Sequence, residues 1–308
     1  MKTEIAPPAS NHPVLARLRA LLADPPPGQV FEISAGGIAS ARLGDGASAI
    51  AFQPLSPGSL DISPLKDNVL NEEAFTAAVQ AAAGGGPGRK RRVALILPDY
   101  CTRIAVLDFD AFPGTAEEQE HLVRFRMKKS VPFDIEGAAL SYYAQPKSGR
   151  KNKIEVVVAV TALEILARYE APFRAAGLHP GIVTTSLLAA LHMVTADGVT
   201  VVAKICGRVL TVGVLDDNAL KLVRCVDLEK VETGEIESVL LPTLAYVEDE
   251  LGRPAKRVLL CGFGPRAAEW AAAWPRTWGV AVEPLRSRLG LPGETDAGVM
   301  GFMESLAA

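Results

Sequence analysis

Two stretches of the chain repeat the same order of apolar and polar segments. In the first stretch, the short apolar segments 30–34, 38–43 and 47–52 are separated by glycine-containing turns. This alternation predicts a three-stranded antiparallel meander. A helix is expected next, beginning after Asn71, a residue type that caps helix N-termini, and ending at the glycines 84–86. The continuous apolar run 92–97 then predicts a buried strand.

The second stretch follows the same order. Strands are predicted at 200–205, 209–215 and 219–226. A helix with one apolar face is predicted over 233–251, kinked at Pro242, and a buried strand over 257–261 leads into a glycine-rich turn. Two meanders, each followed by a helix and a parallel strand, predict a bilobal α/β protein with a cleft between the lobes.

Residues 93–178 have a pattern of their own and are interpreted as an inserted α+β subdomain. Its strands are predicted at 93–97, 103–109, 138–144 and 154–160. One helix is expected to start at the capping box of Thr115 and Glu118, and another to start at Thr161 and stop at Gly177. The predicted organisation is a flexible arm (1–28), a first lobe (29–92 with part of 179–198), the inserted subdomain (93–178) and a second lobe (199–308).

Composition excludes several classes of protein. Of 308 residues, 49% are hydrophobic and 22% charged, which allows a large core. A net charge of −3 gives no reason to expect a nucleic-acid partner. No transmembrane helix or signal peptide is visible, so a cytoplasmic location is expected. The four cysteines form no CxxC pair and the four histidines are scattered, which argues against a disulfide framework or a zinc site.

Three further features have alternative interpretations. The leucine-rich segment 14–22 predicts a short amphipathic helix that either touches a membrane or partner or lies on its own domain. The basic run 89–92 either meets anionic lipid headgroups or is a solvated loop. Gly262, Gly264 and Ala267 have the spacing of a dinucleotide fingerprint, but too few residues follow to complete such a domain.

The segment 93–145 resembles the inserted domain of the PilM family, the actin-like cytoplasmic proteins of type IV pilus assembly. The likeness rests on a strand that ends in Leu97-Pro98, a Phe112-Pro113 turn, a charged helix that leads into Val131-Pro132-Phe133, and a strand with Tyr142. Residues 175–190 and 258–267 resemble the family's passage out of that domain and its last glycine-rich turn.

The resemblance implies an actin/FtsA-type fold of two RNase H-like lobes with ATP and Mg²⁺ in the cleft. It also implies a PilN-like partner, an inner-membrane protein whose short cytoplasmic N-terminal segment docks on the PilM protein. The chain would then lie at the inner face of the inner membrane, held there through this partner. The expected contact surface of the inserted subdomain includes Arg124, Phe125, Lys128, Val131 and Phe133, where a strand edge or groove could accept an extended peptide. The alternative is a stable helix whose charges face water.

An actin-like nucleotide site needs turns that expose backbone N–H groups to phosphate and acidic residues that hold Mg²⁺. In the first turn, Glu32 stands where the family usually has Asp, and Ser34 where it has Gly. In the second, Lys204 replaces the family's acid and Cys206 its glycine. The candidate nucleotide-contacting residues are Glu32, Ser34, Gly36, Gly37, Lys204, Gly207, Gly262 and Gly264.

Lys204 can attract phosphate but cannot bind a divalent cation. ATP is therefore a candidate ligand and Mg²⁺ is disfavoured, and no catalytic residue or metal ligand is assigned. The preferred interpretation is a scaffold with a degenerate nucleotide site that acts by assembly. The alternatives are an active actin-like ATPase, more distantly a sugar kinase, or a relative of the cytoplasmic domain of a type II secretion protein.

Overall fold

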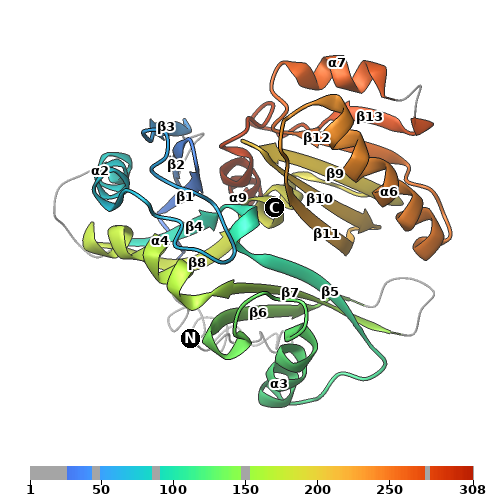
Figure 1. Cartoon of the computed structure of the whole chain (residues 1–308), viewed down its shortest axis with the longest axis horizontal. Helices are drawn as coiled ribbons and strands as arrows, with labels where there is room; N and C mark the ends of the chain where they lie inside the picture. Colours follow the sequence, from blue (N-terminus) through green and yellow to red (C-terminus); the bar gives the residue numbers. More distant parts are fainter. Residues whose placement is uncertain (1–25, 44–48, 85–90, 147–152, 275–277, 308) are drawn as a thin grey trace, which may run out of the picture.

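The computed structural model describes residues 26–43, 49–84, 91–146, 153–274 and 278–307 (Figure 1). The predictions on the helix at 14–22, the turn at 44–46 and the basic residues Arg89 and Lys90 lie outside these described residues. The arrangement is bilobal, with a third, smaller unit beside the two lobes (Figure 1).

The first lobe is built on a five-stranded sheet of order β3-β2-β1-β4-β8. Its strands are β1 (Gln29–Ser34), β2 (Gly37–Arg42), β3 (Ala51–Pro54), β4 (Arg91–Leu97) and β8 (Leu178–Thr185). The meander β1–β2–β3 is antiparallel, whereas β1, β4 and β8 run parallel. Helices α2 (Glu72–Ala83) and α4 (Leu163–Ala175) pack on one face. Asn71 caps α2 by accepting a hydrogen bond from the Ala74 amide, as its position predicts.

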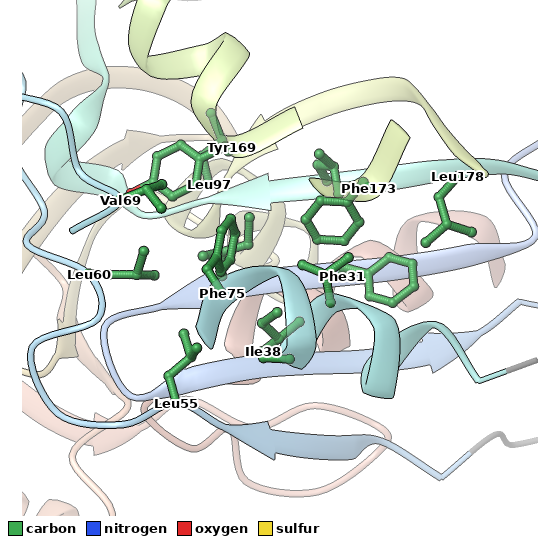
Figure 2. Packing of buried hydrophobic residues seen from close by; sticks show 14 of the residues in the cluster. Phe31, Ile38, Leu55, Leu60, Val69, Phe75, Leu97, Tyr169, Phe173 and Leu178 are labelled. Atoms are coloured by element: carbon green, nitrogen blue, oxygen red, sulfur yellow. The ribbon is translucent and has the colours of Figure 1, made fainter. Parts of the chain in front are cut away.

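Aromatic rings fill the core of this lobe (Figure 2). Phe31 and Phe173 lie edge to face with their ring centroids 5.2 Å apart, and Phe75 contacts both Phe173 and Tyr169 in the same geometry. The rings come from β1, α2 and α4, so their burial holds both helices against the sheet.

The second lobe has the sheet order β11-β10-β9-β12-β13, which matches the first lobe strand for strand. Its strands are β9 (Val199–Cys206), β10 (Val209–Asp216), β11 (Ala219–Asp227), β12 (Arg257–Cys261) and β13 (Ala281–Pro284). Helices α6 (Thr233–Leu251) and α7 (Arg266–Ala273) pack on one face together with Phe263. The duplicated strand order confirms the predicted pair of α/β lobes.

Two helices lie between the sheets of the lobes. Apolar residues of α5 (Ser186–Ala190) and α9 (Ala297–Ala307) pack on the inner faces of both sheets. The two helices approach so closely that a Cβ atom at Gly301 would lie 2.1 Å from the carbonyl oxygen of Ala189. The C-terminal helix α9 therefore packs between the lobes and joins them.

The inserted subdomain is a three-stranded antiparallel sheet of order β5-β7-β6. Its strands are β5 (Arg103–Phe109), β6 (Ala138–Ala144) and β7 (Ile154–Ala162), and α3 (Ala116–Met127) covers one face. The predicted bounds 93–178 are too wide, because β4 pairs with β1 and β8, and α4 belongs to the core of the first lobe. The inserted sheet itself runs from Arg103 to Ala162.

Local signals predicted most helix ends correctly, with one exception. Thr115 accepts a hydrogen bond from the Glu118 amide and begins α3, and α6 has the predicted bounds with Pro242 inside it. The expected helix start at Thr161 is wrong, because Thr161 lies in β7 and its hydroxyl lies 2.7 Å from that of Thr102. Helix α4 begins at Leu163 without a side-chain cap.

Candidate functional site between the lobes

The parallel strands of the first lobe and strand β9 of the second bring four polar side chains together. Glu32 lies near the carboxyl end of β1, Asp99 follows β4, and Ser186 follows β8 as the first residue of α5. Lys204 projects from β9 of the other lobe. The carboxyl ends of parallel strands share one edge of a sheet, which is why residues so distant in sequence converge here. We call Glu32, Asp99, Ser186 and Lys204 the interlobe cluster.

The interlobe cluster is closed to solvent. The exposed fractions of Glu32, Asp99, Ser186 and Lys204 are 2%, 5%, 3% and 1%. The Lys204 ammonium lies 3.1 Å from Asp99 Oδ2, which makes an ion pair between the lobes. The Ser186 hydroxyl donates a short hydrogen bond to Glu32 Oε1. A buried charge is tolerated only with such partners, so the pair holds the two lobes together at this point.

Backbone amides satisfy the remaining carboxylate oxygens. The Val299 amide, in the first turn of α9, donates to Glu32 Oε2 at 2.9 Å, and the Leu187 amide of α5 donates to Asp99 Oδ1 at 2.7 Å. Free N–H groups at helix N-termini are common anion-binding groups, and here two of them bind the protein's own carboxylates. All four oxygens of Glu32 and Asp99 therefore already accept a hydrogen bond or an ammonium contact.

Burial and charge set the protonation of the cluster. Removal from water raises the pKa of Glu32 from 4.5 to about 7, although Lys204, Ser186 and the Val299 amide oppose this shift. Burial by itself would lower the pKa of Lys204, but nearby negative charge, chiefly that of Asp99, raises it above its ordinary value. Below about pH 7 the Glu32 carboxyl group is thus mostly protonated, beside the ammonium group of Lys204.

This arrangement does not fit Mg²⁺ with a nucleotide. A divalent cation needs carboxylate oxygens that are free to ligate it, and both carboxyl groups are occupied. Lys204 supplies a positive charge at the position where the resemblance leads one to expect an acid. Among the described residues, no group of three or more His, Cys, Asp or Glu side chains is placed to hold a metal ion.

The packing of the hairpin explains Ser34 and Gly37, two residues of the first turn predicted to contact a nucleotide. Ser34 is buried, and its hydroxyl donates to the Gly37 carbonyl oxygen at 2.9 Å across the hairpin. A Cβ atom at Gly37 would lie 2.4 Å from the carbonyl oxygen of Gln53 on the neighbouring strand β3. Glycine is thus required at position 37 by strand packing, while Gly36 lies exposed at the tip of the turn.

The other predicted turns are also explained by packing and backbone conformation. Gly207 occupies the hairpin between β9 and β10 with a φ of 57°, which favours glycine. Gly262 has a φ of 77°, and a Cβ atom there would lie 2.3 Å from the Ile205 carbonyl oxygen. Gly264 has a φ of 56°, in the turn before α7. These glycines are compatible with a nucleotide site but do not require one.

Sequence reasoning singled out Glu32 and Lys204 but missed Asp99 and Ser186. Asp99 follows Leu97-Pro98 directly, within the motif that carries the family resemblance, so an acid at the end of a buried parallel strand was a usable signal. Ser186 gave no signal of its own. Burial also raises the pKa of the cysteine thiols, that of Cys261 to about 12 and that of Cys206 to about 11, so both thiols stay protonated at neutral pH.

The five residues predicted to contact a partner do not form one open surface. Phe125 and Lys128 are exposed on α3. Arg124 donates to the Ile135 carbonyl oxygen at 2.7 Å and pairs with Glu120. Val131 and Phe133 are partly buried against the core of the inserted subdomain.

Comparisons with solved structures identify the fold as actin-like. The chain superposes on a structure entitled "PilM-PilN type IV pilus biogenesis complex" with a TM-score of 0.68 and 21% identity, over 90% of this chain and 97% of the other. It superposes on the cytoplasmic domain of EpsL, an inner-membrane component of the type II secretion system of Vibrio cholerae, with a TM-score of 0.54 and 13% identity, over 91% and 94%. A Bacteroides thetaiotaomicron protein with an actin-like ATPase fold gives a TM-score of 0.50 at 10% identity, over 83% and 89%.

These similarities confirm the expected fold, the actin-like type of PilM. No protein-family model matches the sequence, and no curated protein is similar to it in sequence. In the described part of the chain, no helix is long and apolar enough to cross a membrane.

Proposed function

We propose that this chain is a PilM-like scaffold of type IV pilus assembly that binds the N-terminal segment of a PilN-like inner-membrane protein. The observation that carries the proposal is the similarity to PilM over 90% of the chain, in a structure determined as a complex with PilN. The scaffold would work at the cytoplasmic face of the inner membrane and associate with the membrane through its partner.

The interlobe cluster supports a role without ATP turnover. Hydrolysis in an actin-like cleft depends on Mg²⁺ and on carboxylates that position the metal and a water molecule. Here the carboxyl groups of Glu32 and Asp99 bind Ser186, Lys204 and two backbone amides instead. We infer that closure of the lobes needs no nucleotide, so the molecule presents one constant surface to its partners.

The outer edge of β6 is our proposed docking site for the partner's segment. Strand β6 is at the edge of the inserted sheet, and no described strand pairs with its outer side. The Gln145 amide donates to the Glu155 carbonyl oxygen at 2.8 Å, toward β7. Along an antiparallel strand, successive backbone N–H groups point to opposite sides. The N–H groups of Tyr142 and Ala144 therefore point outward, away from β7. An extended peptide gains affinity by pairing with such an edge.

A binding experiment tests both the identity of the partner and the position of its docking site on β6. Labelled peptides that correspond to cytoplasmic N-terminal segments of PilN-like proteins are titrated against the full chain. Ala144→Pro removes one outward N–H group and keeps the bonds to β7, so we expect it to weaken binding by about tenfold, the equivalent of about one hydrogen bond in affinity. Ser141→Ala, on the same strand with an inward amide, is the matched control and should bind normally.

The same titration contains the outcomes that count against the proposal. Failure of every PilN-like peptide to bind would contradict the partner, whereas equal binding by the Ala144→Pro variant would contradict only the docking site. Addition of ATP and Mg²⁺ should leave the melting temperature of the chain unchanged. Saturable binding of ATP would contradict the degenerate site.

The similarity to the EpsL cytoplasmic domain favours a second candidate, a component of a type II secretion system. Its TM-score and identity are lower than those of the PilM structure. Cytoplasmic segments of secretion-system inner-membrane proteins, added to the same titration, separate the two. Binding of those peptides alone would replace the pilus assignment.

A further inference from the structure

Helix α3 carries an exposed aromatic side chain on a charged surface. The side chain of Phe125 is 75% exposed, although most phenylalanines of this protein are buried in its cores. Figure 1 shows α3 on the outer side of the inserted subdomain, away from both lobes. A pocket of about 350 Å³ lies beside Phe125, and its lining includes Glu117, His121, Lys128 and Ile135. An aromatic residue next to a pocket on an open face is typical of a protein contact.

The charges on this helix are divided between its two halves. Glu117, Glu118 and Glu120 lie in the N-terminal half, whereas Arg124, Arg126, Lys128 and Lys129 lie in or just after the C-terminal half. Several of these charges are used within the subdomain. Arg124 pairs with Glu120 at 2.9 Å, the guanidinium of Arg126 lies over the Phe109 ring, and Glu118 accepts from Thr115.

Of the charges not used in this way, Glu117 and Lys128 are the two that line the pocket. Both are exposed, and neither has a charged partner among the described residues. They are eleven residues apart, which is about three turns, so they lie on the same stripe of the helix. Phe125 and His121 lie between them on that stripe, and all four line the pocket.

We propose that a second copy of this chain docks on this stripe, with the two α3 helices antiparallel about a two-fold axis. In that arrangement Glu117 of each copy faces Lys128 of the other, which makes two equivalent ion pairs. Phe125 of each copy then lies opposite Glu120 and His121 of the other and enters the pocket beside them. Isologous contacts of this kind are the commonest way in which identical chains associate.

Charge complementarity favours a second copy over a peptide partner. The stripe carries a negative charge at one end of a short helix and a positive charge at the other, so it is complementary to a reversed copy of itself. An extended peptide would have to carry the matching opposite charges at the same spacing. The stripe is also on α3, not on the β6 edge, so self-association leaves the proposed docking site of the partner open.

Light scattering coupled to size-exclusion chromatography, over a range of concentrations, tests this proposal on the full chain. The wild type should show a mass that rises toward that of a dimer. Glu117→Lys and Lys128→Glu each place like charges opposite one another twice, so each variant alone should dissociate at least about tenfold more readily. An equimolar mixture of the two variants restores both pairs in a heterodimer and should recover the dimer mass.

The matched controls keep the outcome clear. Glu73→Lys reverses one exposed charge on α2, far along the chain from α3, and should leave the dimer unchanged. Phe125→Ser should abolish it while the circular dichroism spectrum stays the same, because the ring is exposed. A wild type that remains monomeric at every concentration overturns the proposal. So does a mixture that fails to recover the dimer, or loss of PilN-like peptide binding in the Phe125→Ser variant without a change in mass.

Discussion

At the scale of single residues, the buried carboxyl group of Glu32 links a strand of the first lobe to the C-terminal helix. It accepts hydrogen bonds from the Ser186 hydroxyl and the Val299 amide. A Cβ atom at Gly298 would lie 3.0 Å from the Glu32 carboxyl carbon, so α9 begins directly against it. Glu32 thus serves the contact between a strand and the C-terminal helix.

This burial makes the stability of the protein depend on pH. The pKa of Glu32 is 4.5 in the unfolded chain and about 7 in the folded one, so the folded state binds the proton more tightly. The contribution to stability is therefore complete below pH 4.5 and is lost as the pH rises through 7. The difference between the two pKa values corresponds to about 3 kcal/mol.

Glu32→Gln is expected to remove this dependence. The amide can accept from Val299 and donate to the Ser186 hydroxyl, and it has no proton to lose. The free energy of unfolding of the variant, measured by urea denaturation, should gain up to about 3 kcal/mol relative to the wild type between pH 4.5 and 8. Glu73→Gln, an exposed glutamate on α2, should follow the wild type. Parallel pH profiles for Glu32→Gln and the wild type would show that Glu32 ionises normally.

At the scale of elements, the contact between α5 and α9 decides how the lobes meet. Both are helices of the interior, and they cross where Gly301 lies against the backbone of Ala189. A helical glycine normally costs stability relative to alanine, so its presence in α9 indicates a steric requirement. The packing of α9 against α5 supplies that requirement.

Gly301→Ala should therefore destabilise the protein despite the better helix propensity of alanine. The added methyl group would overlap the Ala189 carbonyl oxygen, and such overpacking typically costs about 1–3 kcal/mol. Gly234→Ala in the first turn of α6, where no atom lies within 4 Å of the added Cβ, is the matched control and should be neutral or slightly stabilising. Thermal unfolding measures both, and equal melting temperatures would contradict the close contact.

At the scale of the whole molecule, two polar contacts hold the second lobe in addition to the packing of α5 and α9. The interlobe cluster joins the two lobes at the centre, through Lys204 and Asp99. The inserted subdomain contacts the second lobe as well, because the Gln145 side chain pairs with the Leu220 backbone at 2.7 and 2.8 Å. Lys221 and Glu155 form an ion pair beside it. The contacts at the centre and those made by the inserted subdomain both favour a conformation in which the lobes stay packed together.

The central ion pair should show strong coupling between its partners. Lys204→Met leaves the Asp99 carboxylate buried without its cation, which is expected to cost about 3–5 kcal/mol. Adding Asp99→Asn to this variant removes the stranded charge, so the double variant should be more stable than Lys204→Met alone. Urea denaturation of both single variants and the double variant measures the coupling. Additive losses would show that the two groups do not depend on each other.

The sequence predicted the two meanders and the helix and strand that follow each of them, but not β13 or α9. Periodicity and caps predicted the start of α3, both ends of α6 and the two meanders, because these depend on residues a few positions apart. It also singled out Lys204 as a candidate site residue, and the structure places this lysine in the interlobe cluster. The tertiary structure alone decided what the lysine binds. Asp99 lies 105 residues away, and β4 and α4 belong to the first lobe, because burial and pairing between distant segments outweigh local signals.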